Sequence, residues 1–490
     1  MWEDLAQGFV LFATPEMILL FGLGIAIGVV IGAIPGLSVT LAVSLALPFT
    51  FAMDPAPAIV FLTGLYKGGT YGGSITAILI RTPGTPAAAC TVLDGYPLAR
   101  QGKAAKALDA ALYASCIADL LSNLSLIFLA GLIVTIARQF GPAEYFWLVC
   151  FSLTMVAAVS GPSLSKGGIA VAIGLLASTV GRDLFYGSDR LTFGSQNLAS
   201  GLGLIPLLIG LFAVAEVISH YATRAKERIA FSSAGPGLTW PETRALLPTI
   251  LRSSAIGVGV GAIPGTGGGI ASFVAYGEAK RTSREPERFG RGALDGVAAA
   301  EAGNNGVAGA TLIPLLALGV PGDVVTAIML GAFMIHDLTP GPALFERHGP
   351  IVYAIFFGLA LSPLWLLGIG KVASRAFARV SMVPADLLMP SVLLLCVLGS
   401  YSVSNSVFDV GVMAVAGAFG YVMLRTGLPP APLVIAFVLG PLLEDNFRRC
   451  LRIGRGRAEY FVDDPMSWLF ITLTILSLVA IWRQRRRSVL

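Results

Sequence analysis

Apolar stretches follow one another along almost the whole chain, and charged residues are concentrated in the short segments between them. Of the 490 residues, 55% are hydrophobic and only 12% are charged, whereas a soluble domain has roughly 25% charged residues. Leu202–His220 and Met466–Trp482 have the length that a membrane-spanning helix requires, about 20 residues. Continuous apolar runs of this length indicate helices, which satisfy their backbone hydrogen bonds within the segment, as lipid requires. The sequence therefore predicts an all-α polytopic protein embedded in a lipid bilayer.

Basic residues suggest how the chain is oriented and where it divides. Trp468 and Trp482 bracket the last apolar run, and four arginines follow within residues 483–487. By the positive-inside rule we expect this tail to be cytoplasmic, together with the basic loop His220–Arg252. We divide the chain into a first membrane repeat (1–220), a cytoplasmic linker (221–249), a second membrane repeat (250–465) and a final transmembrane helix with a basic tail (466–490).

Sequence motifs recur in the same order in the two halves. The pentapeptide Gly-Ala-Ile-Pro-Gly occurs at Gly32–Gly36 and again at Gly261–Gly265. Downstream, an apolar run ends in Pro-Gly in both halves, and a segment that begins with Asp and ends with Gly follows. The corresponding segments are Ile75–Gly84 with Ile313–Gly322, and Asp94–Gly102 with Asp337–Gly349. This order predicts two related halves of inverted topology, each with helices that Pro-Gly breaks within the membrane.

Pro-Gly pairs inside a membrane would create an environment for ions. Proline lacks an N–H and glycine tolerates unusual φ angles, so the pair turns a chain sharply. Such a turn exposes helix N-termini, which attract anions, and helix C-termini, which attract cations. We therefore expect an anionic substrate carried together with Na⁺ or H⁺. The alternative is that each Pro-Gly is an ordinary turn at the membrane surface.

With motifs such as Gly32–Gly36, Asn304-Asn305 and Leu318–Gly322, the chain resembles the large membrane subunit of the bacterial tripartite tricarboxylate transporters. The resemblance implies ion-gradient-driven uptake of citrate-like di- or tricarboxylates in the bacterial inner membrane. It also implies two partners, a periplasmic substrate-binding protein and a small four-helix membrane subunit. The stretches that carry the resemblance are Leu5–Phe9, Gly32–Gly36, Tyr71–Ser74, Pro83-Gly84, Leu93–Pro97, Gly141–Phe146, Leu251–Ser254, Gly296–Ala299, Asn304-Asn305, Leu318–Gly322 and Thr339–Pro342.

Two positions depart from the family pattern. The family has Pro before the Glu of its Pro-Glu-x-x-Asn-Asn element, and here Ala300 precedes Glu301. A small residue commonly follows the second Pro-Gly, and here Asp323 follows it. A carboxylate there would repel a trianion unless it were protonated or ion-paired, which argues against citrate itself.

Polar residues in the apolar hairpins are the candidates for substrate or ion binding, because an unpaired polar group in lipid is costly. Hydroxyl and amide groups can bind a carboxylate or coordinate Na⁺, while hydrogen bonding between helices is the alternative role. The candidates are Gly36, Ser74, Thr76, Thr82, Pro83, Gly84, Thr85, Gly265, Asn304, Asn305, Thr311, Pro321, Gly322 and Asp323.

Charged residues near the hairpins offer further roles. Lys67 and Arg81 are the cations nearest the first hairpin and are candidates for neutralising the substrate, although Arg81 also fits an interface position. Asp94 and Glu301, like Asp323, are candidates for ion or proton sites, but Asp94 is better explained as bracing its own turn. With three histidines in the chain, we expect no metal site other than one for Na⁺, and no cofactor.

Other functions fit the sequence less well. No GxSxG or HExxH motif occurs, so we expect no enzymatic activity. No GxxxxGK[ST] motif occurs, so we expect no ATPase; the net charge of +5 requires no nucleic-acid partner. A channel fits the hydropathy, but a duplicated core of broken helices favours alternating access, and we prefer an elevator motion. The main alternative is a self-sufficient carrier of another organic anion that works without a binding protein.

Overall fold

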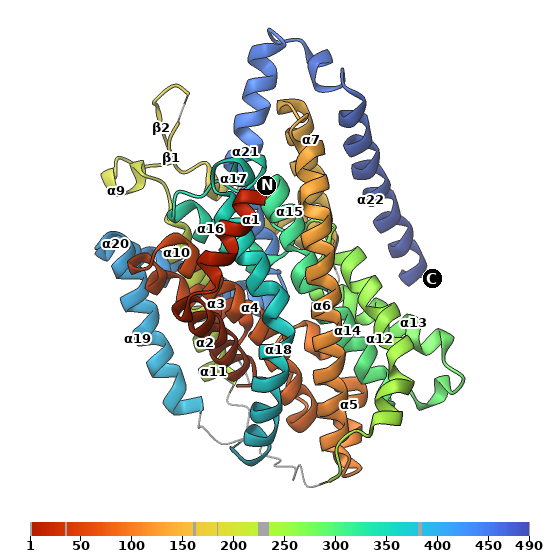
Figure 1. The fold of residues 1–490 in the computed structure, drawn as a ribbon. Helices are drawn as coiled ribbons and strands as arrows, with labels where there is room; N and C mark the ends of the chain where they lie inside the picture. Colours follow the sequence, from red (N-terminus) through yellow and green to blue (C-terminus); the bar gives the residue numbers. More distant parts are fainter. Residues whose placement is uncertain are drawn as a thin grey trace.

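The computed structural model describes residues 2–34, 37–159, 163–183, 185–223, 235–380 and 385–489, and these are almost entirely helical (Figure 1). The elements up to residue 223 include one two-stranded antiparallel hairpin. They are α1 (Trp2–Phe12), α2 (Pro15–Gly32), α3 (Val39–Ala46), η1 (Leu47–Ala52), α4 (Pro55–Ile80), η2 (Ala87–Ala89), α5 (Val92–Arg100), α6 (Ala104–Ala137), α7 (Pro142–Val159), α8 (Leu164–Ser178), β1 (Gly181–Arg182), β2 (Asp189–Arg190), α9 (Gln196–Ala199), α10 (Leu204–Leu208), the π-helical η3 (Ile209–Val214) and α11 (Ala215–Thr223).

The elements after residue 234 are all helical. They are α12 (Trp240–Gly261), α13 (Gly267–Thr282), η4 (Pro286–Arg288), α14 (Leu294–Ala310), α15 (Leu312–Leu318), α16 (Val324–Ile335), α17 (Pro342–Arg347), α18 (Gly349–Val380), α19 (Ala385–Ser404), α20 (Val407–Thr426), α21 (Pro430–Ile453), η5 (Ala458–Phe461) and α22 (Pro465–Val489).

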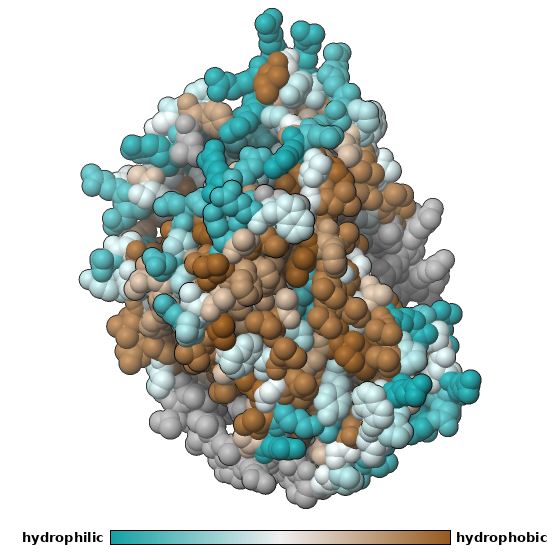
Figure 2. Space-filling model, in the orientation of Figure 1, coloured by the Kyte–Doolittle hydropathy of each residue, from teal (hydrophilic) through white to brown (hydrophobic). Residues whose placement is uncertain are grey.

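An apolar band crosses the middle of one face of the molecule. Figure 2 shows hydrophobic residues across the centre of one face, with hydrophilic residues above them and at the lower right. Six helical segments in the described part are long and apolar enough to cross a membrane. The predicted all-α polytopic membrane fold is confirmed. The six segments are Pro15–Gly32, Ala104–Ala137, Leu204–Ala222, Gly349–Ala376, Val407–Thr426 and Pro430–Ile453.

Glycines bring α2 and α4 into backbone contact. A Cβ at Gly28 would lie 2.7 Å from the nitrogen of Gly69, and one at Gly68 would lie 2.8 Å from the carbonyl carbon of Ile25. Further along, a Cβ at Gly32 would lie 2.6 Å from the oxygen of Gly69. The contacts advance in the same direction along both helices, so α2 and α4 run parallel. In a membrane, small residues allow such close packing, and dispersion then stabilises the pair.

The second half contains a similar parallel pair, α12 and α14. A Cβ at Gly257 would lie 2.6 Å from the oxygen of Gly303, and one at Gly261 would lie 2.9 Å from the oxygen of Val307. Each glycine-packed pair thus consists of the helix that leads into a Gly-Ala-Ile-Pro-Gly pentapeptide and the helix that leads toward a Pro-Gly pair.

The long helices α6 and α18 lie side by side in opposite directions. Two polar contacts fix their register: Lys371 Nζ donates to Asp109 Oδ1 at 2.9 Å, and Ser362 donates to Asp119. Successive partners advance along α6 and recede along α18, which establishes the antiparallel arrangement.

A polar hairpin covers the C-terminal end of α21 outside the apolar band. Asp183, which precedes β2, accepts two hydrogen bonds from the Arg448 guanidinium, at 3.0 and 2.7 Å. Its Oδ1 also accepts the backbone N–H of Phe185 at 2.7 Å. The Arg448 guanidinium beside it holds the pKa of Asp183 well below its usual range.

Candidate functional site

Each of the two predicted Pro-Gly turns ends a helix in the same way. Arg81, which follows α4, and Gly319, which follows α15, both adopt left-handed backbone conformations, with φ of 60° and 72°. Both stand two residues before the proline of their Pro-Gly pair. The next N–H in each turn bonds back six residues, from Thr82 to the oxygen of Thr76 at 3.4 Å and from Val320 to the oxygen of Pro314 at 3.2 Å. This is a Schellman-type helix stop.

The Pro-Gly turns lie against the pentapeptide ends. A Cβ at Gly84 would overlap the carbonyl oxygen of Gly32, and the N–H of Gly84 bonds to Gly73 O at 3.3 Å. In the other half, the N–H of Gly265 bonds to Gly322 O at 2.8 Å. The first pentapeptide's Pro35 and the predicted site residue Gly36 lie outside the described residues.

A cavity of about 200 Å³ lies between these turns. Its lining comes from matched places in the two halves. One set, residues 38–40 and 267–269, begins two positions after each pentapeptide, and another, residues 85–87 and 323–325, directly follows a Pro-Gly pair. Side chains of α4 and α14 complete the lining. The lining residues are Ser38, Val39, Thr40, Tyr66, Thr70, Thr85, Pro86, Ala87, Gly267, Gly268, Gly269, Asn304, Val307, Asp323, Val324 and Val325.

Helix N-termini surround this cavity. The helices α3, α13 and α16 all begin among its lining residues, and so does the 3₁₀ turn η2. Ser38 caps α3 by accepting the N–H of Leu41 at 3.1 Å, and Asp323 caps α16 by accepting the N–H of Thr326 at 2.8 Å. Among the described residues no lysine or arginine lines the cavity. The groups that favour an anion here are therefore the helix dipoles and free N–H groups, and the Asp323 carboxylate opposes them.

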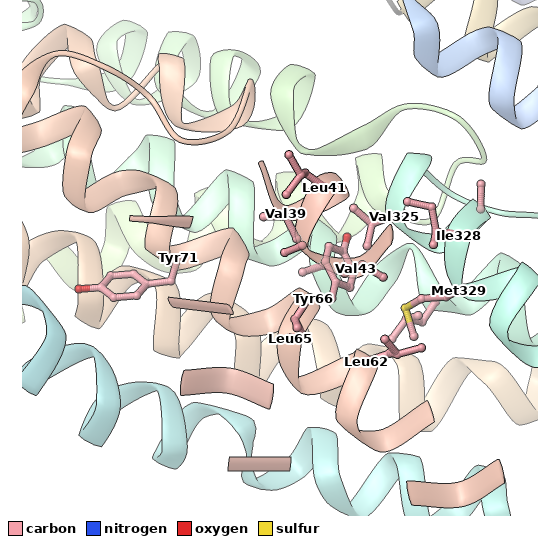
Figure 3. Packing of buried hydrophobic residues seen from close by; sticks show 14 of the residues in the cluster. Val39, Leu41, Val43, Leu62, Leu65, Tyr66, Tyr71, Val325, Ile328 and Met329 are labelled. Atoms are coloured by element: carbon pink, nitrogen blue, oxygen red, sulfur yellow. The ribbon is translucent and has the colours of Figure 1, made fainter. Parts of the chain in front are cut away.

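Tyr66 connects the two halves at the cavity wall. Its hydroxyl donates to Asp323 Oδ2 at 2.8 Å and lies 3.2 Å from Thr311 Oγ1. Figure 3 shows Tyr66 beside Val39 of α3 and Val325 of α16, whereas Tyr71 lies apart from this group. Both oxygens of Asp323 are thus engaged, one by its own helix cap and one by Tyr66.

The neighbouring asparagines of α14 have different surroundings. Asn304 lines the cavity, and its Nδ2 donates to the oxygen of Thr70 at 3.3 Å. Asn305 turns to a separate buried cluster, where its Nδ2 donates to Ser115 Oγ at 2.8 Å and to the oxygen of Glu301 at 3.1 Å. The two residues therefore belong to different sites.

Glu301 is the centre of that second cluster, and it is completely buried. Thr91 donates to its Oε1 and Ser115 donates to its Oε2 at 3.3 Å. Ser74 lies beside the carboxylate, and its hydroxyl donates to the oxygen of Tyr71 at 2.6 Å. We call Glu301, Asn305, Ser115, Thr91 and Ser74 the Glu301 cluster. Its members come from α14, α6, the segment before α5 and α4.

Lys67 lies in a third buried cluster. Its ammonium donates to Asp119 Oδ1 at 2.6 Å and to Asn123 Oδ1 at 2.7 Å, and Ser362 donates to the other oxygen of Asp119. Lys67 and Asp119 are each only 1% exposed. We call these four residues the Lys67 cluster. Lys67 does not line the cavity, and its charge already has a partner.

Comparison with known proteins identifies the family. The model of the tripartite tricarboxylate transporter TctA family matches residues 18–435. The chain belongs to this family. It is also 33% identical over 466 residues to an uncharacterized 52.8 kDa protein in the TAR-I ttuC' 3' region of Agrobacterium vitis, covering 95% of this chain and 93% of that protein. An uncharacterized protein in the TAR-II ttuC' 3' region of the same organism is 37% identical over 234 residues, covering 47% of this chain and 97% of that protein. No solved structure matches.

The remaining predicted residues of this TctA family member have varied positions. Pro83 and Pro321 form the turns, and Thr85 caps η2 by accepting the N–H of Ala88 at 3.1 Å. Thr76 bonds within its own helix, to the oxygen of Gly73 at 3.4 Å. Arg81 and Thr82 are exposed, and the Arg81 guanidinium lies 5.9 Å from the centre of the Tyr96 ring. Arg81 and Thr82 lie outside the cavity lining.

Asp94 braces a distant loop. Its Oδ1 accepts the backbone N–H groups of Gly290, Gly292 and Ala293 at 2.8–2.9 Å, and its Oδ2 accepts the hydroxyl of Tyr276 at 2.9 Å. It therefore fixes the entry to α14. Asp94 itself lies in the first turn of helix α5, so it does not brace a turn of its own, contrary to the expectation from the sequence.

Sequence reasoning missed several cavity residues in this TctA family protein. Tyr66 and Thr70 lie in the middle of α4, far from any Pro-Gly pair, and only the tertiary crossing of α4 with α14 brings them to the cavity. Ser38–Thr40 and Gly267–Gly269 were missed as well, although a signal existed: both segments follow the identical pentapeptides at the same spacing.

Proposed function

We propose that this chain is the permease subunit of an ion-gradient-driven uptake system for di- or tricarboxylates. Membership of the TctA family gives the transporter class. The observation that carries the substrate class is the cavity between the Pro-Gly turns, because helix N-termini converge on it and no described basic side chain lines it. Helix N-termini favour the binding of carboxylate groups. Because no described residue with a fixed positive charge lines the cavity, the substrate is not held too tightly to be released.

The groups around the cavity suit a carboxylate with hydroxyl substituents. The hydroxyls of Ser38, Thr40 and Thr85 and the amide of Asn304 supply both donors and acceptors. Asp323 contributes a negative charge, but its hydrogen bonds with Tyr66 and with the start of α16 occupy both of its oxygens. These donors are neutral, so they leave the charge of Asp323 in place, and this charge still argues against citrate itself.

We further propose that the two halves are inverted repeats. The pairs α2–α4 and α12–α14 are each parallel, but α4 and α14 cross in opposite directions. Ser74 lies beside Glu301, whereas Thr70, earlier in α4, accepts a hydrogen bond from Asn304, later in α14. Such an arrangement places matched hairpins at one midplane site and permits alternating access. We favour an elevator motion in which the glycine-packed pairs and their hairpins move as one body.

The remaining assignments follow from the proposed system. The chain would lie in the bacterial inner membrane with its C-terminus cytoplasmic. A periplasmic substrate-binding protein would deliver the carboxylate, and a small four-helix membrane subunit would accompany this chain. The second candidate is a carrier that needs no binding protein, and the cavity favours it equally, because the cavity would bind the same anion in either system.

The test is uptake into vesicles of radiolabelled mono-, di- and tricarboxylates under imposed Na⁺ or proton gradients. We expect uptake that stops when both gradients are collapsed, even with ATP present. Asn304→Ala removes an amide from the cavity wall, so uptake should fall at least tenfold while the protein still inserts. A matched control is Asn446→Ala, since Asn446 bonds to the oxygen of Leu442 within α21.

Two results would contradict the proposal: no carboxylate transported above empty vesicles, or full uptake by Asn304→Ala. The same assay separates the two candidates. Uptake that requires the cognate periplasmic protein supports the binding-protein system, and equal uptake without it supports the self-sufficient carrier.

A further inference from the structure

Two members of the Lys67 cluster match two members of the Glu301 cluster between the halves, although the carboxylates, Asp119 of α6 and Glu301 of α14, come from unmatched helices. Lys67 stands sixteen residues before Pro83, and Asn305 stands sixteen residues before Pro321. The serines match as well: Ser115 stands thirteen residues after Gly102, and Ser362 thirteen residues after Gly349. Each cluster therefore combines residues of both halves. Lys67 of α4 shares its cluster with Ser362 of α18, and Asn305 of α14 shares its cluster with Ser115 of α6.

The Lys67 cluster is a cage of oxygens around a cation. The ammonium nitrogen lies 2.6 Å from a carboxylate oxygen of Asp119 and 2.7 Å from the amide oxygen of Asn123. Asn123 is held in this orientation because its Nδ2 donates to the oxygen of Leu359 and to Ser362 Oγ, at 2.8 and 2.9 Å. One positive charge thus balances one buried carboxylate.

The Glu301 cluster has the carboxylate and the oxygens but no cation. Among the described residues, no lysine, arginine or histidine forms an ion pair with Glu301. Its partners are neutral: the hydroxyls of Thr91, Ser115 and Ser74 and the amide of Asn305. A buried carboxylate without a counter-charge is costly in a membrane, and such groups commonly mark ion pathways.

We propose that the Glu301 cluster binds a Na⁺ ion, at the place where Lys67 supplies a permanent cation in the first half. Hydroxyl oxygens can turn their lone pairs toward a cation, and the amide oxygen of Asn305 can do so after rotation of the side chain. These oxygens and the carboxylate are the hard ligands that alkali and alkaline-earth ions prefer. A single carboxylate neutralises a monovalent ion and would leave a divalent one with a buried excess charge.

The site adjoins the cavity, because Asn305 and the cavity residue Asn304 are consecutive. In the carrier proposed above, on which this part of the inference depends, the bound Na⁺ is the coupling ion and its charge compensates the carboxylate substrate. The binding of Na⁺ itself does not depend on the transport proposal, so the two can fail separately.

The experiment uses Na⁺ alone as the probe, with no carboxylate present. The melting temperature of the purified full-length protein is measured in NaCl and in choline chloride at constant ionic strength. A ligand that binds only the native state stabilises it by RT ln(1 + L/Kd), where L is the free ligand concentration, so the melting temperature rises with the ligand concentration. We expect Na⁺ to stabilise the wild type, and Glu301→Gln to weaken the apparent Na⁺ affinity at least tenfold.

A second variant makes the test independent of any folding defect in Glu301→Gln. Asn305→Lys places an ammonium beside Glu301, as Lys67 lies beside Asp119, so it should be stable without Na⁺ and should not respond to Na⁺. The control is Glu278→Gln, since Glu278 pairs with Arg281 at the surface, and it should keep the wild-type response.

Two outcomes would overturn the proposal. In one, the variants Glu301→Gln and Asn305→Lys respond to Na⁺ as strongly as the wild type does. In the other, Na⁺ does not stabilise the wild type at any pH, whether or not acid alone stabilises it. Stabilisation by acid alone would assign Glu301 to a proton. Loss of the Na⁺ response in both variants, with Glu278→Gln unaffected, supports the site even if no carboxylate is transported.

Discussion

The buried pair Lys67–Asp119 provides the sharpest test of the packing between α4 and α6. At 2.6 Å, the Coulomb attraction of the pair is about 6 kcal/mol for an effective dielectric constant of 20. Dehydration of the two charges offsets most of this. Removing one partner leaves the other charge buried, which costs about 3–5 kcal/mol, whereas replacing both by apolar residues is close to neutral. We therefore expect Lys67→Met and Asp119→Leu each to destabilise the protein by about 3–5 kcal/mol.

A double-mutant cycle measures this coupling. Unfolding free energies of the wild type, both single variants and the double variant are obtained from reversible unfolding in mixed micelles. The double variant should lie within about 2 kcal/mol of the wild type, so the coupling energy should exceed about 4 kcal/mol. A control cycle on the exposed pair Glu278–Arg281 should give less than about 1 kcal/mol.

Additive single effects would refute this reasoning, because they would mean that neither charge depends on the other. Single variants as stable as the wild type would refute it too, because they would mean that water or lipid headgroups reach the pair. If the double variant retains carboxylate uptake, the charge of Lys67 serves the fold and does not neutralise the substrate.

Two further predictions concern helix packing and the polar hairpin. Gly68→Ala should destabilise the protein by about 2–3 kcal/mol, because its Cβ would lie 2.8 Å from the carbonyl carbon of Ile25. The control is Gly277→Ala, whose Cβ would have no atom within 4 Å, and it should stabilise the protein by about 0.5–1 kcal/mol. Both free energies are measured by unfolding in micelles. Arg448 depresses the pKa of Asp183, so this pair should stabilise the hairpin at neutral pH and lose its effect as the pH falls below about 4. At pH 7, hydrogen exchange of the β1–β2 amides should therefore be faster in Asp183→Asn than in the wild type. At pH 3 this difference in exchange rate should be smaller. A difference that does not change with pH would contradict the stabilising role of the Asp183–Arg448 pair.

The sequence predicted the features that depend on local chemistry. Composition and apolar runs predicted the all-α membrane fold, because lipid leaves the backbone few alternatives. The Pro-Gly pairs predicted where α4 and α15 stop, and both helices stop there in the left-handed conformation. Motif resemblance predicted the family. All of these are carried by a few neighbouring residues.

Side-chain surroundings could not be predicted in the same way. Asn304 and Asn305 are adjacent, but about 100° separates consecutive side chains on a helix, so one lines the cavity and the other joins Glu301. Lys67 was expected near the substrate because it lies close to the first hairpin in sequence. Its partner Asp119 comes from α6, fifty-two residues further on, and no local pattern links the two.

In the proposed mechanism, departures from symmetry give the two halves different tasks. A carrier built from identical halves would present two equal clusters, each competing for the same ion. Here Lys67 closes one cluster with a cation that cannot leave, and Asn305, at the matched position, leaves the other open beside Glu301. Tyr66 and Asn304 also differ, although both line the cavity from matched helices. Under the proposed mechanism, one exchangeable Na⁺, bound in the Glu301 cluster, therefore accompanies each substrate. The variant Lys67→Asn would create a second open cluster around Asp119, and it should increase the number of Na⁺ ions bound per protein from one to two.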